Sequence, residues 1–519
     1  MLPIFKNEPL TDFSKPGEQS AFKAALERVK SRLGETHPLV VGGREIYREN
    51  TSATINPSRP QEVLGHFSKG TLDDANYAVE VAADAFKKWQ YTPADERARY
   101  LLKAAAEMRR RKHEFSAIMV LEVGKSWVEA DADTAEAIDF LEYYARQAMR
   151  LADQSHMLTM YAPEQLQLVN IPLGVGAVIA PWNFPLAIPT GMMSAALVSG
   201  NTVVFKPAEI SPLIAWEMCQ LFWRQGIPDG VLNFLSGSGS VVGARIVDHP
   251  LTRFISFTGS KEVGINIFES AAKVHPGQKW LKRTILEMGG KDAVLVDETA
   301  DLEAAAVGIV ASAFGFQGQK CSAGSRAIIV REVYDQVVSR AVEIASKLQV
   351  GAPDAGSHID MGPVVDQKSM TKIMSYIEVG TQEGELLFGG APVVTPEGGY
   401  FLQPTIFGNV DGRARIAQEE IFGPVLAILP ADDFDHALYL ANDTEFGLTG
   451  ALYSMRRDRL EVARREYHVG NLYFNRKCTG ALVGVHPFGG FNMSGTDSKA
   501  GSPDYLMLFM QAKSIAERL

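Results

Sequence analysis

The sequence is poor in cysteine and has no long apolar run. Its three cysteines in 519 residues are too few for a disulfide framework, and their spacings match no zinc-binding pattern, so no metal site is predicted. No segment approaches the about 20 consecutive apolar residues that a membrane-spanning helix needs. Residues 1–9 (MLPIFKNEP) lack the basic start and apolar core of an export signal. These absences predict a soluble protein of a reducing compartment, the cytoplasm, with no membrane partner.

A surplus of basic residues is also missing. The chain carries 51 Lys and Arg against 61 Asp and Glu, a formal charge of −10 at pH 7, and no cationic cluster offsets it. A nucleic-acid-binding surface needs a basic patch that attracts phosphates. We therefore expect no nucleic-acid partner. What the chain has instead is a hydrophobic fraction of 46%, enough for a large buried core.

Short β-rich runs alternate with helical stretches from residue 174 to 287. Buried strands are expected at four runs rich in apolar and β-branched residues: 175–180, 202–205, 231–235 and 253–257. Helices are expected between them, one of which begins with Ser211 as N-cap and Pro212 in its first turn. Repeated strand–helix units predict a parallel sheet covered on both faces.

A second series of the same kind follows residue 287. It comprises an expected strand at 293–296, a helix at 304–314 and a strand at 326–330. Two α/β lobes are therefore predicted to meet where the two series join. The earlier stretch 72–150 is rich in Ala, Glu, Arg and Leu at helical spacing, and we assign it a structural role as a helical layer.

Cys321 differs from the other cysteines in its surroundings. A lone cysteine is most often a small packing residue, and Cys219, in an apolar helical stretch, fits that description. Cys321 lies in FQGQKCSA (316–323), where small and polar neighbours leave the sulfur approachable. A thiol adds readily to an aldehyde, and once hydride has left the adduct, a carboxylate such as Glu287 can direct water onto the thioester. The pair predicts an enzyme that oxidises a small-molecule aldehyde. A thiol hydrolase is the rival, but none of the ten histidines lies in a recognisable Cys–His setting.

A dinucleotide site is expected in the first lobe, because parallel sheets bind ligands beyond the carboxyl ends of their strands. Residues 257–260 (FTGS) end one strand and precede a helix, where free N–H groups and a hydroxyl suit a pyrophosphate. Lys206 and Glu209 follow another strand and suit the adenosine ribose, although a surface ion pair explains them equally well. The glycine spacing in 237–243 (GSGSVVG) departs from the usual fingerprint, and a plain turn is an equally good interpretation.

Six runs resemble, in order and spacing, the motifs of the aldehyde dehydrogenases. They are PWNFP (181–185), FKPAE (205–209), FTGS (257–260), EMGGK (287–291), GQKC (318–321) and EIFGP (420–424). The resemblance spans nearly the whole chain, and a chance match of six ordered runs is negligible. It implies an α/β, aldehyde dehydrogenase-like fold with a Rossmann-type cofactor domain, an α/β catalytic domain and a small β oligomerisation flap.

The resemblance also implies a role for each matched residue. Cys321 would be the nucleophile and Glu287 the general base, and the side-chain amide of Asn183 would stabilise the oxyanion with the backbone N–H of Cys321. The residues that would hold NAD are Lys206 and Glu209 at the adenosine ribose, Ser260 at the pyrophosphate, and Glu420 and Phe422 at the nicotinamide end. Because the carboxylate of Glu209 repels a 2′-phosphate, NAD is favoured over NADP.

Two further regions resemble one branch of this family. FKNEP (5–9), and PFGGF (487–491) through SGTDSKAG (494–501), are similar to the enzymes that oxidise L-glutamate γ-semialdehyde to L-glutamate in proline catabolism. That semialdehyde is in equilibrium with 1-pyrroline-5-carboxylate. The residues that would contact it are Ser322, Gly480 and Ala481 at the carboxylate, and Phe184 and Phe488 at the aliphatic stem. Simple core packing is the alternative for the two aromatic residues, and a different semialdehyde is the alternative substrate.

The domain limits follow from the same resemblance. They are an N-terminal arm (1–37), an NAD-binding domain (38–148 and 170–287), a catalytic domain (288–482), and an oligomerisation flap with a C-terminal tail (149–169 and 483–519). The alternating residues 165–169 (QLQLV) suit an exposed strand that pairs with another subunit. We expect a homodimer or a larger homo-oligomer.

Overall fold

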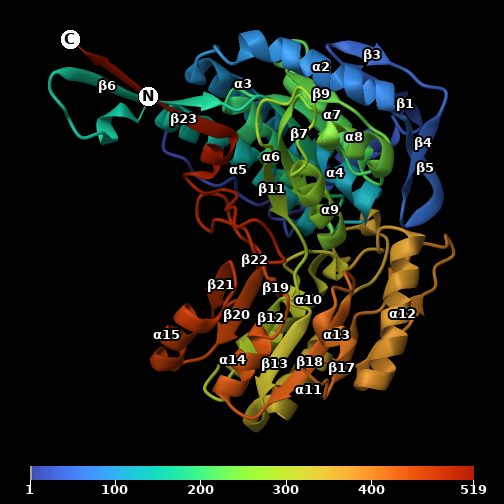
Figure 1. The fold of residues 1–519 in the computed structure, drawn as a ribbon. Coiled ribbons are helices and arrows are strands. Elements are labelled where there is room, and N and C mark those ends of the chain that lie inside the picture. The colour runs from blue at the N-terminus through green and yellow to red at the C-terminus, as the bar shows by residue number, and fades with distance from the viewer. Residues whose placement is uncertain (1–2, 153, 519) are drawn as a thin grey trace.

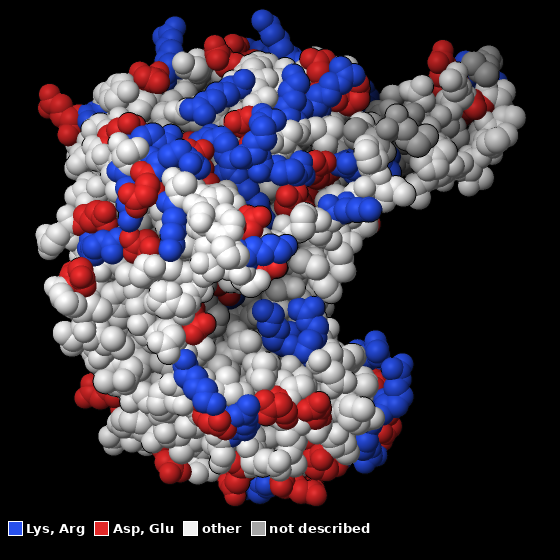
Figure 2. Space-filling model, turned by 180° about the vertical axis from the view of Figure 1, so that it is seen from behind, with Lys and Arg blue, Asp and Glu red and all other residues white. Residues whose placement is uncertain are grey.

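The chain folds into two α/β lobes and a projecting two-stranded ribbon (Figure 1). The computed structural model describes residues 3–152 and 154–518; the expected arm, flap and tail include residues 1–2, 153 and 519, which lie outside that part. The predicted α/β class is confirmed. Seen from behind, the surface is hollowed between the lobes, and acidic and basic side chains are interspersed over this face (Figure 2).

The first lobe is built on a seven-stranded sheet of order β11-β10-β7-β8-β9-β2-β3. Its strands are β2 (Leu39–Val41), β3 (Arg44–Ile46), β7 (Val175–Ile179), β8 (Thr202–Lys206), β9 (Leu232–Phe234), β10 (Thr252–Thr258) and β11 (Arg283–Glu287). The strands from β7 to β11 run parallel, which confirms the four predicted strands, while β2 and β3 add an antiparallel edge. Every residue of β8 is buried, because helices cover both faces of the sheet.

Alternate side chains of these strands face two different helical layers. In β8, Val203 and Phe205 pack against the core of one layer, and Val204 against that of the other. The first layer consists of α1 (Pro16–Lys30), α3 (Ala94–Arg110), α4 (Lys112–Val123), α5 (Trp127–Leu151), α6 (Ala187–Val198) and α7 (Pro212–Arg224). The second consists of α2 (Leu72–Trp89), α8 (Ala244–Asp248) and α9 (Lys261–Ala271). Within the described ranges, no helix is both long and apolar enough to cross a membrane.

The second lobe repeats the plan with a sheet of order β14-β17-β18-β13-β12-β20-β21. Its strands are β12 (Ala293–Val296), β13 (Arg326–Val330), β14 (Glu385–Phe388), β17 (Thr405–Gly408), β18 (Val425–Ala431), β20 (Thr449–Tyr453) and β21 (Asn471–Phe474). Its helices are α10 (Leu302–Phe314), α11 (Tyr334–Ala345), α12 (Gln367–Glu383), α13 (Arg415–Gln418), α14 (Phe434–Asn442) and α15 (Arg457–Glu466). The predicted strands at 293–296 and 326–330 and the helix between them are confirmed.

The predicted start of α7 is correct in position but wrong in its cap. Ser211 is the N-cap and Pro212 follows it, yet the Ser211 hydroxyl makes no capping hydrogen bond. The backbone N–H groups of Leu213 and Ile214 donate instead to the two carboxylate oxygens of Glu122, at 2.7 and 3.0 Å. A residue of α4 therefore supplies the cap that the local sequence only suggested.

The projecting ribbon joins two distant parts of the chain. β6 (Glu164–Pro172) contains the alternating run 165–169 and pairs antiparallel with β23 (Met510–Arg518) along its whole length. The expected strand is confirmed, and its partner on one side is a strand of the same chain. The pairing of the ribbon with another subunit stays a prediction.

Candidate active site

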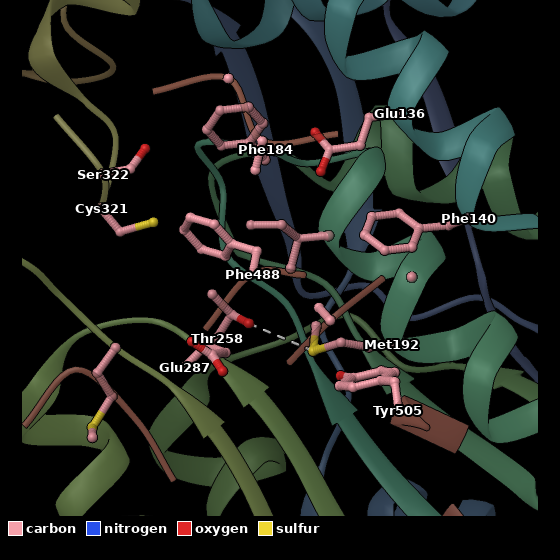
Figure 3. Close-up of a pocket in the computed structure, with 16 residues that line it drawn as sticks. Glu136, Phe140, Phe184, Met192, Thr258, Glu287, Cys321, Ser322, Phe488 and Tyr505 are labelled. Atoms are coloured by element: carbon pink, nitrogen blue, oxygen red, sulfur yellow. Dashed lines mark hydrogen bonds between the residues drawn. The ribbon is translucent and has the colours of Figure 1, made fainter. Parts of the chain in front are cut away.

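A cavity of about 120 Å³ lies between the lobes and is lined by both of them (Figure 3). Seven of the residues predicted for the site share this wall: Phe184, Glu287, Cys321, Ser322, Gly480, Ala481 and Phe488. They come from four separate parts of the sequence. The fold thus gathers the predicted nucleophile, the predicted base and all the predicted substrate contacts around one space.

The loop that carries Cys321 leaves α10 through an unusual backbone path. Phe316 and Gln317 have positive φ angles of 47° and 56°, and Gly318 follows at 66°. A Cβ at Gly318 would lie 2.3 Å from the carbonyl oxygen of Gly423, so only glycine fits there. Burial, and after it nearby carboxylates such as Asp292, raise the pKa of the Cys321 thiol well above its usual value. These surroundings favour the protonated thiol over the thiolate.

Glu287 ends β11 and reaches the same cavity. The hydroxyl of Ser498 donates to its Oε1 at 2.5 Å, while its Oε2 has no hydrogen-bond partner among the described residues. Burial raises the pKa of this carboxyl group to about 8, in spite of that hydrogen bond. A carboxyl group with such a pKa can release and accept a proton near neutral pH, as a general base must.

Asn183 lies beside the loop of the nucleophile but is not among the residues that line the cavity. Its side-chain Nδ2 donates to the backbone oxygen of Gln319 at 3.1 Å, and only 4% of the residue is exposed. This bond uses one of the two hydrogens on Nδ2 and holds the amide within two residues of Cys321. The second hydrogen has no acceptor among the described residues.

Part of the cavity wall offers hydrogen-bond donors that have no partner among the described residues. Gly480 has a left-handed φ of 82°, and the backbone N–H groups of Gly480 and Ala481 donate to no atom of the described part of the chain. The hydroxyl of Ser322 lines the same wall. Unpaired donors of this kind suit a carboxylate, which accepts several hydrogen bonds at once.

Across the cavity lies a face of α5 that the sequence analysis assigned a structural role only. Residues Glu129, Asp133, Glu136 and Phe140 recur every three or four positions and so share one side of the helix. Glu136 and Phe140 line the cavity, which corrects that assignment. Burial and then the charge of Asp133 raise the pKa of Glu136 to about 8. The sequence feature that could have indicated this role is the row of carboxylates, Glu129, Asp133 and Glu136, on one side of the helix.

A buried ion pair lies against two aromatic rings of this region, those of Phe184 and Phe316. The ammonium of Lys125 lies 3.1 Å from the Oδ2 of Asp133, and neither side chain is exposed. The same nitrogen is 4.0 Å from the ring centre of Phe184 and 4.2 Å from that of Phe316. Figure 3 shows Phe184 and Phe488 between the loop of Cys321 and the side chains of α5. Both of these aromatic residues therefore face the cavity.

The residues expected to hold the adenosine half of a dinucleotide follow strands of the first sheet. Lys206 ends β8, is 4% exposed, and donates to the carbonyl oxygen of Pro207. The carboxylate of Glu209 accepts from the backbone N–H of Gly239 at 2.9 Å. Among the described residues the two form no ion pair, which argues against the surface ion pair. Ser260 caps α9, where its hydroxyl accepts from the N–H of Val263.

The residues expected at the nicotinamide end lie close to the catalytic motifs. The Oε1 of Glu420 accepts from the backbone N–H of Gly290 at 3.1 Å, and a Cβ at Gly289 would lie 2.4 Å from its Oε2. Phe422 has a positive φ of 61°, and its ring centre is 5.6 Å from that of Trp182. Glu420 is thus tied to the EMGGK run, and Phe422 to the PWNFP run.

Comparisons with known proteins agree with this geometry. The profile of the aldehyde dehydrogenase family matches residues 46–515. The chain is 57% identical to a 1-pyrroline-5-carboxylate dehydrogenase of Geobacillus sp. (strain WCH70), with 100% of both chains covered. It is also similar to a crystal structure of 1-pyrroline-5-carboxylate dehydrogenase from Thermus with bound NAD, at 51% identity, a TM-score of 0.97 and full coverage of both chains. Proline utilization A from Bdellovibrio bacteriovorus is 44% identical, with a TM-score of 0.97 over 99% of this chain and 53% of the other.

Proposed function

The chain belongs to the aldehyde dehydrogenase family, and from that membership we propose that it oxidises L-glutamate γ-semialdehyde to L-glutamate with NAD. The observation that carries the proposal is the shared cavity. The thiol of Cys321 and the carboxyl group of Glu287, whose pKa is raised, share its wall with the unpaired N–H groups of Gly480 and Ala481 and with the carboxyl group of Glu136. An amino-acid aldehyde needs all four features at once.

The polar groups of the cavity wall match the two charged groups of the substrate, which share its α-carbon and therefore lie at the same end of the molecule. The N–H groups of Gly480 and Ala481, with the hydroxyl of Ser322, bind its carboxylate. Glu136 accepts hydrogen bonds from its α-ammonium, and the positive charge of that group favours the ionised form of Glu136. The aromatic side chains of Phe184 and Phe488 enclose the methylene groups that join the α-carbon of the substrate to its aldehyde.

The first half-reaction makes a carbon–sulfur bond. The thiol of Cys321 releases its proton to solvent water as its sulfur adds to the aldehyde carbon, the carbonyl π bond breaks, and the carbonyl oxygen takes up the negative charge. The second hydrogen of the Asn183 amide and the backbone N–H of Cys321 bind this oxygen, and two such donors stabilise the transition state by a few kcal/mol, about 3 or more. NAD, when bound, supplies the acceptor for the hydride that leaves the adduct, and a thioester remains.

The second half-reaction hydrolyses that thioester. Glu287 takes a proton from water while the water oxygen adds to the thioester carbon, the C–S bond breaks, and sulfur leaves as the thiolate. The acid product is L-glutamate. The partnerless Oε2 of Glu287 is the oxygen available to accept the proton.

The residues that follow the strands of the first sheet are suited to bind NAD. Lys206 uses only one of its three hydrogens, on Pro207, so it retains donors for a ribose hydroxyl. Glu209 follows the same strand, and its carboxylate opposes a 2′-phosphate, which favours NAD over NADP. Glu420 and Phe422 hold the nicotinamide end next to Cys321, and Ser260 stands at the N-terminus of α9, where an anion is stabilised.

The test is a panel of aldehydes with NAD on the native protein and on Cys321→Ala. We expect NADH formation with L-glutamate γ-semialdehyde from the native protein and none above background from the variant. Cys219→Ala is the matched control, because this cysteine is buried in α7 away from the cavity. Retention of the native rate by Cys321→Ala would refute the assignment of the nucleophile.

The second candidate is an aldehyde dehydrogenase for another semialdehyde. Succinate semialdehyde has the carboxylate but no ammonium group. Glu136 has no hydrogen-bond partner among the described residues, and this favours the amino-acid substrate over succinate semialdehyde. A kcat/KM for succinate semialdehyde higher than that for L-glutamate γ-semialdehyde would favour this second candidate instead.

We further propose the domain limits given above and a homodimer built on the ribbon of β6 and β23. Among the described residues the ribbon has two strands, so each has an edge that pairs with no other strand, although Leu168 of β6 already bonds to Gln154 and Ser155 at that edge. We also propose the cytoplasm as the site of action, because the nucleophile must remain a free thiol and all three cysteines are free. Light scattering of the native protein, and of a variant with proline in β6, tests the dimer.

A further inference from the structure

A short segment after the second lobe crosses the end of β11. We call residues 494–500 the strap. The backbone N–H of Met288 donates to the carbonyl oxygen of Ser494 at 2.8 Å, and that of Thr496 to the carbonyl oxygen of Leu286 at 3.0 Å. Glu287 lies between these two bonds and forms an antiparallel bridge with Gly495. The strap therefore fixes the backbone on both sides of the predicted base.

The strap also holds the carboxylate of that base. Ser498 is 4% exposed, and its hydroxyl donates to Glu287 Oε1 at 2.5 Å. Among the described residues it is the sole side chain that makes a hydrogen bond to this carboxylate. The bond fixes one oxygen, and the other, Oε2, remains without a partner.

The position of Ser498 is itself set by close backbone packing. The ammonium of Lys499, the next residue, donates to the carbonyl oxygens of Gly470 and Gly489. A Cβ at Gly489 would lie 1.7 Å from the carbonyl oxygen of Ser498 and 2.9 Å from Glu287 Oε1. Ala500 and Phe488 exchange both of their backbone hydrogen bonds. One rigid unit therefore carries both the aromatic wall of the cavity and the partner of the base.

We propose that Ser498 is the positioning residue of the general base. This inference rests on the proposed function, in which Glu287 takes a proton from the water that attacks the thioester. The hydroxyl of Ser498 binds Oε1 and turns Oε2 toward that water. It also favours the ionised carboxylate, because a hydrogen bond to the charged form stabilises that form. The role concerns hydrolysis alone, since hydride leaves the adduct before the base acts on water.

Rapid-mixing measurements of NADH separate the two half-reactions. In Ser498→Cys, which keeps the shape but loses the strong donor, we expect the first turnover to form NADH within twofold of the native rate. The steady-state rate falls at least tenfold, so a burst of about one NADH per site precedes it. Ser498→Thr retains a hydroxyl and restores at least half of the native steady-state rate.

A control and a pH profile distinguish positioning from a structural role. Thr496→Val removes another hydroxyl of the strap, one that accepts from the backbone N–H of Leu286 at 3.0 Å without touching the carboxylate. It leaves the ratio of burst to steady state unchanged. In Ser498→Cys the rising limb of the pH–rate profile moves to higher pH by at least half a unit. The native charged and titratable groups that face Glu287, namely Asp497, Lys499, Tyr505 and Cys321, are retained in all of these variants. Ser498→Cys adds one thiol to this set, so Ser498→Ala, which adds none, must show the same displacement of the limb.

The outcomes are distinct. A native steady-state rate in Ser498→Cys, or an equal slowing of its first turnover, overturns the inference while the proposed function stands. If the native protein forms no NADH from L-glutamate γ-semialdehyde, the proposed function fails instead. The hydrolysis of p-nitrophenyl acetate, which needs only the thiol and the base, then tests Ser498 independently: a tenfold slower release of the acyl group in Ser498→Cys supports the inference, and an unchanged release overturns it.

Discussion

The buried ion pair of Lys125 and Asp133 yields the sharpest prediction on stability. Its two charges are 3.1 Å apart, and neither side chain is exposed. Lys125→Met leaves the Asp133 carboxylate buried without its partner, which costs about 3–5 kcal/mol in the free energy of unfolding. The loss of two desolvated cation–π contacts, with Phe184 and Phe316, adds to this, at roughly 1–2 kcal/mol each. Denaturant unfolding followed by fluorescence measures the change.

A double variant tests whether the two residues act as a pair. Asp133→Asn keeps an oxygen for the backbone N–H of Ala187, which donates to Asp133 Oδ1 at 2.7 Å. The double variant Lys125→Met with Asp133→Asn leaves neither member of this pair charged. Its loss in the free energy of unfolding should therefore be smaller than the sum of the two single losses, by about 2 kcal/mol or more. The exposed pair Lys87–Asp84 serves as the matched control, and Lys87→Met leaves the unfolding midpoint unchanged. Additive losses within about 0.5 kcal/mol would refute the reasoning.

Three further predictions concern activity. Glu136→Gln lowers kcat/KM for L-glutamate γ-semialdehyde by about 10- to 150-fold, which corresponds to the loss of a charged hydrogen bond of roughly 1.5–3 kcal/mol. The kcat/KM for succinate semialdehyde stays within twofold of the native value. Equal losses for the two substrates would contradict the binding of the ammonium group by Glu136. Gly289→Ala places a Cβ 2.4 Å from Glu420 Oε2, so we expect titration with NAD to give a KM raised about tenfold, or about 1.4 kcal/mol. Because burial raises the pKa of Glu287 to about 8, hydrolysis of the thioester slows as the pH falls below that value and the carboxyl keeps its proton; a flat profile from pH 6 to 9 would argue against this base.

The sequence predicted those parts of the molecule whose causes are local. Runs such as 202–205 are apolar and β-branched throughout, so their burial in a parallel sheet follows from composition. Cys321 and Glu287 were predicted to share a site because their residue types and immediate neighbours suit the chemistry, and the structure places both at one cavity. The order of the strands within a sheet cannot be predicted from composition in the same way. The strands β2 and β3 are three residues each, too short for their sequence to indicate that they pair antiparallel at the edge of the sheet.

Residues that act through distant partners were missed. Ser211 has the side chain of an N-cap, but the carboxylate of Glu122 occupies the site because α4 packs against α7. Glu136 belongs to a helix whose composition suggests only packing, and it faces the cavity because of the way α5 packs against α6. Ser498 lies in a run that resembled the family, yet its contact with Glu287 joins residues 211 positions apart. Each of these depends on tertiary packing, which no local pattern records.

The place of the strap in the chain has a consequence for synthesis. Both seven-stranded sheets are encoded before residue 494, although residues 505–510 add to the core of the first lobe, so the strands and the loop of Cys321 are made before the hydroxyl that bonds to Glu287. β23 comes later still and must find β6 across more than 300 residues, a closure that is entropically costly and slow. In a growing chain, Cys321 and Glu287 are therefore made before Ser498, the residue that we propose positions Glu287.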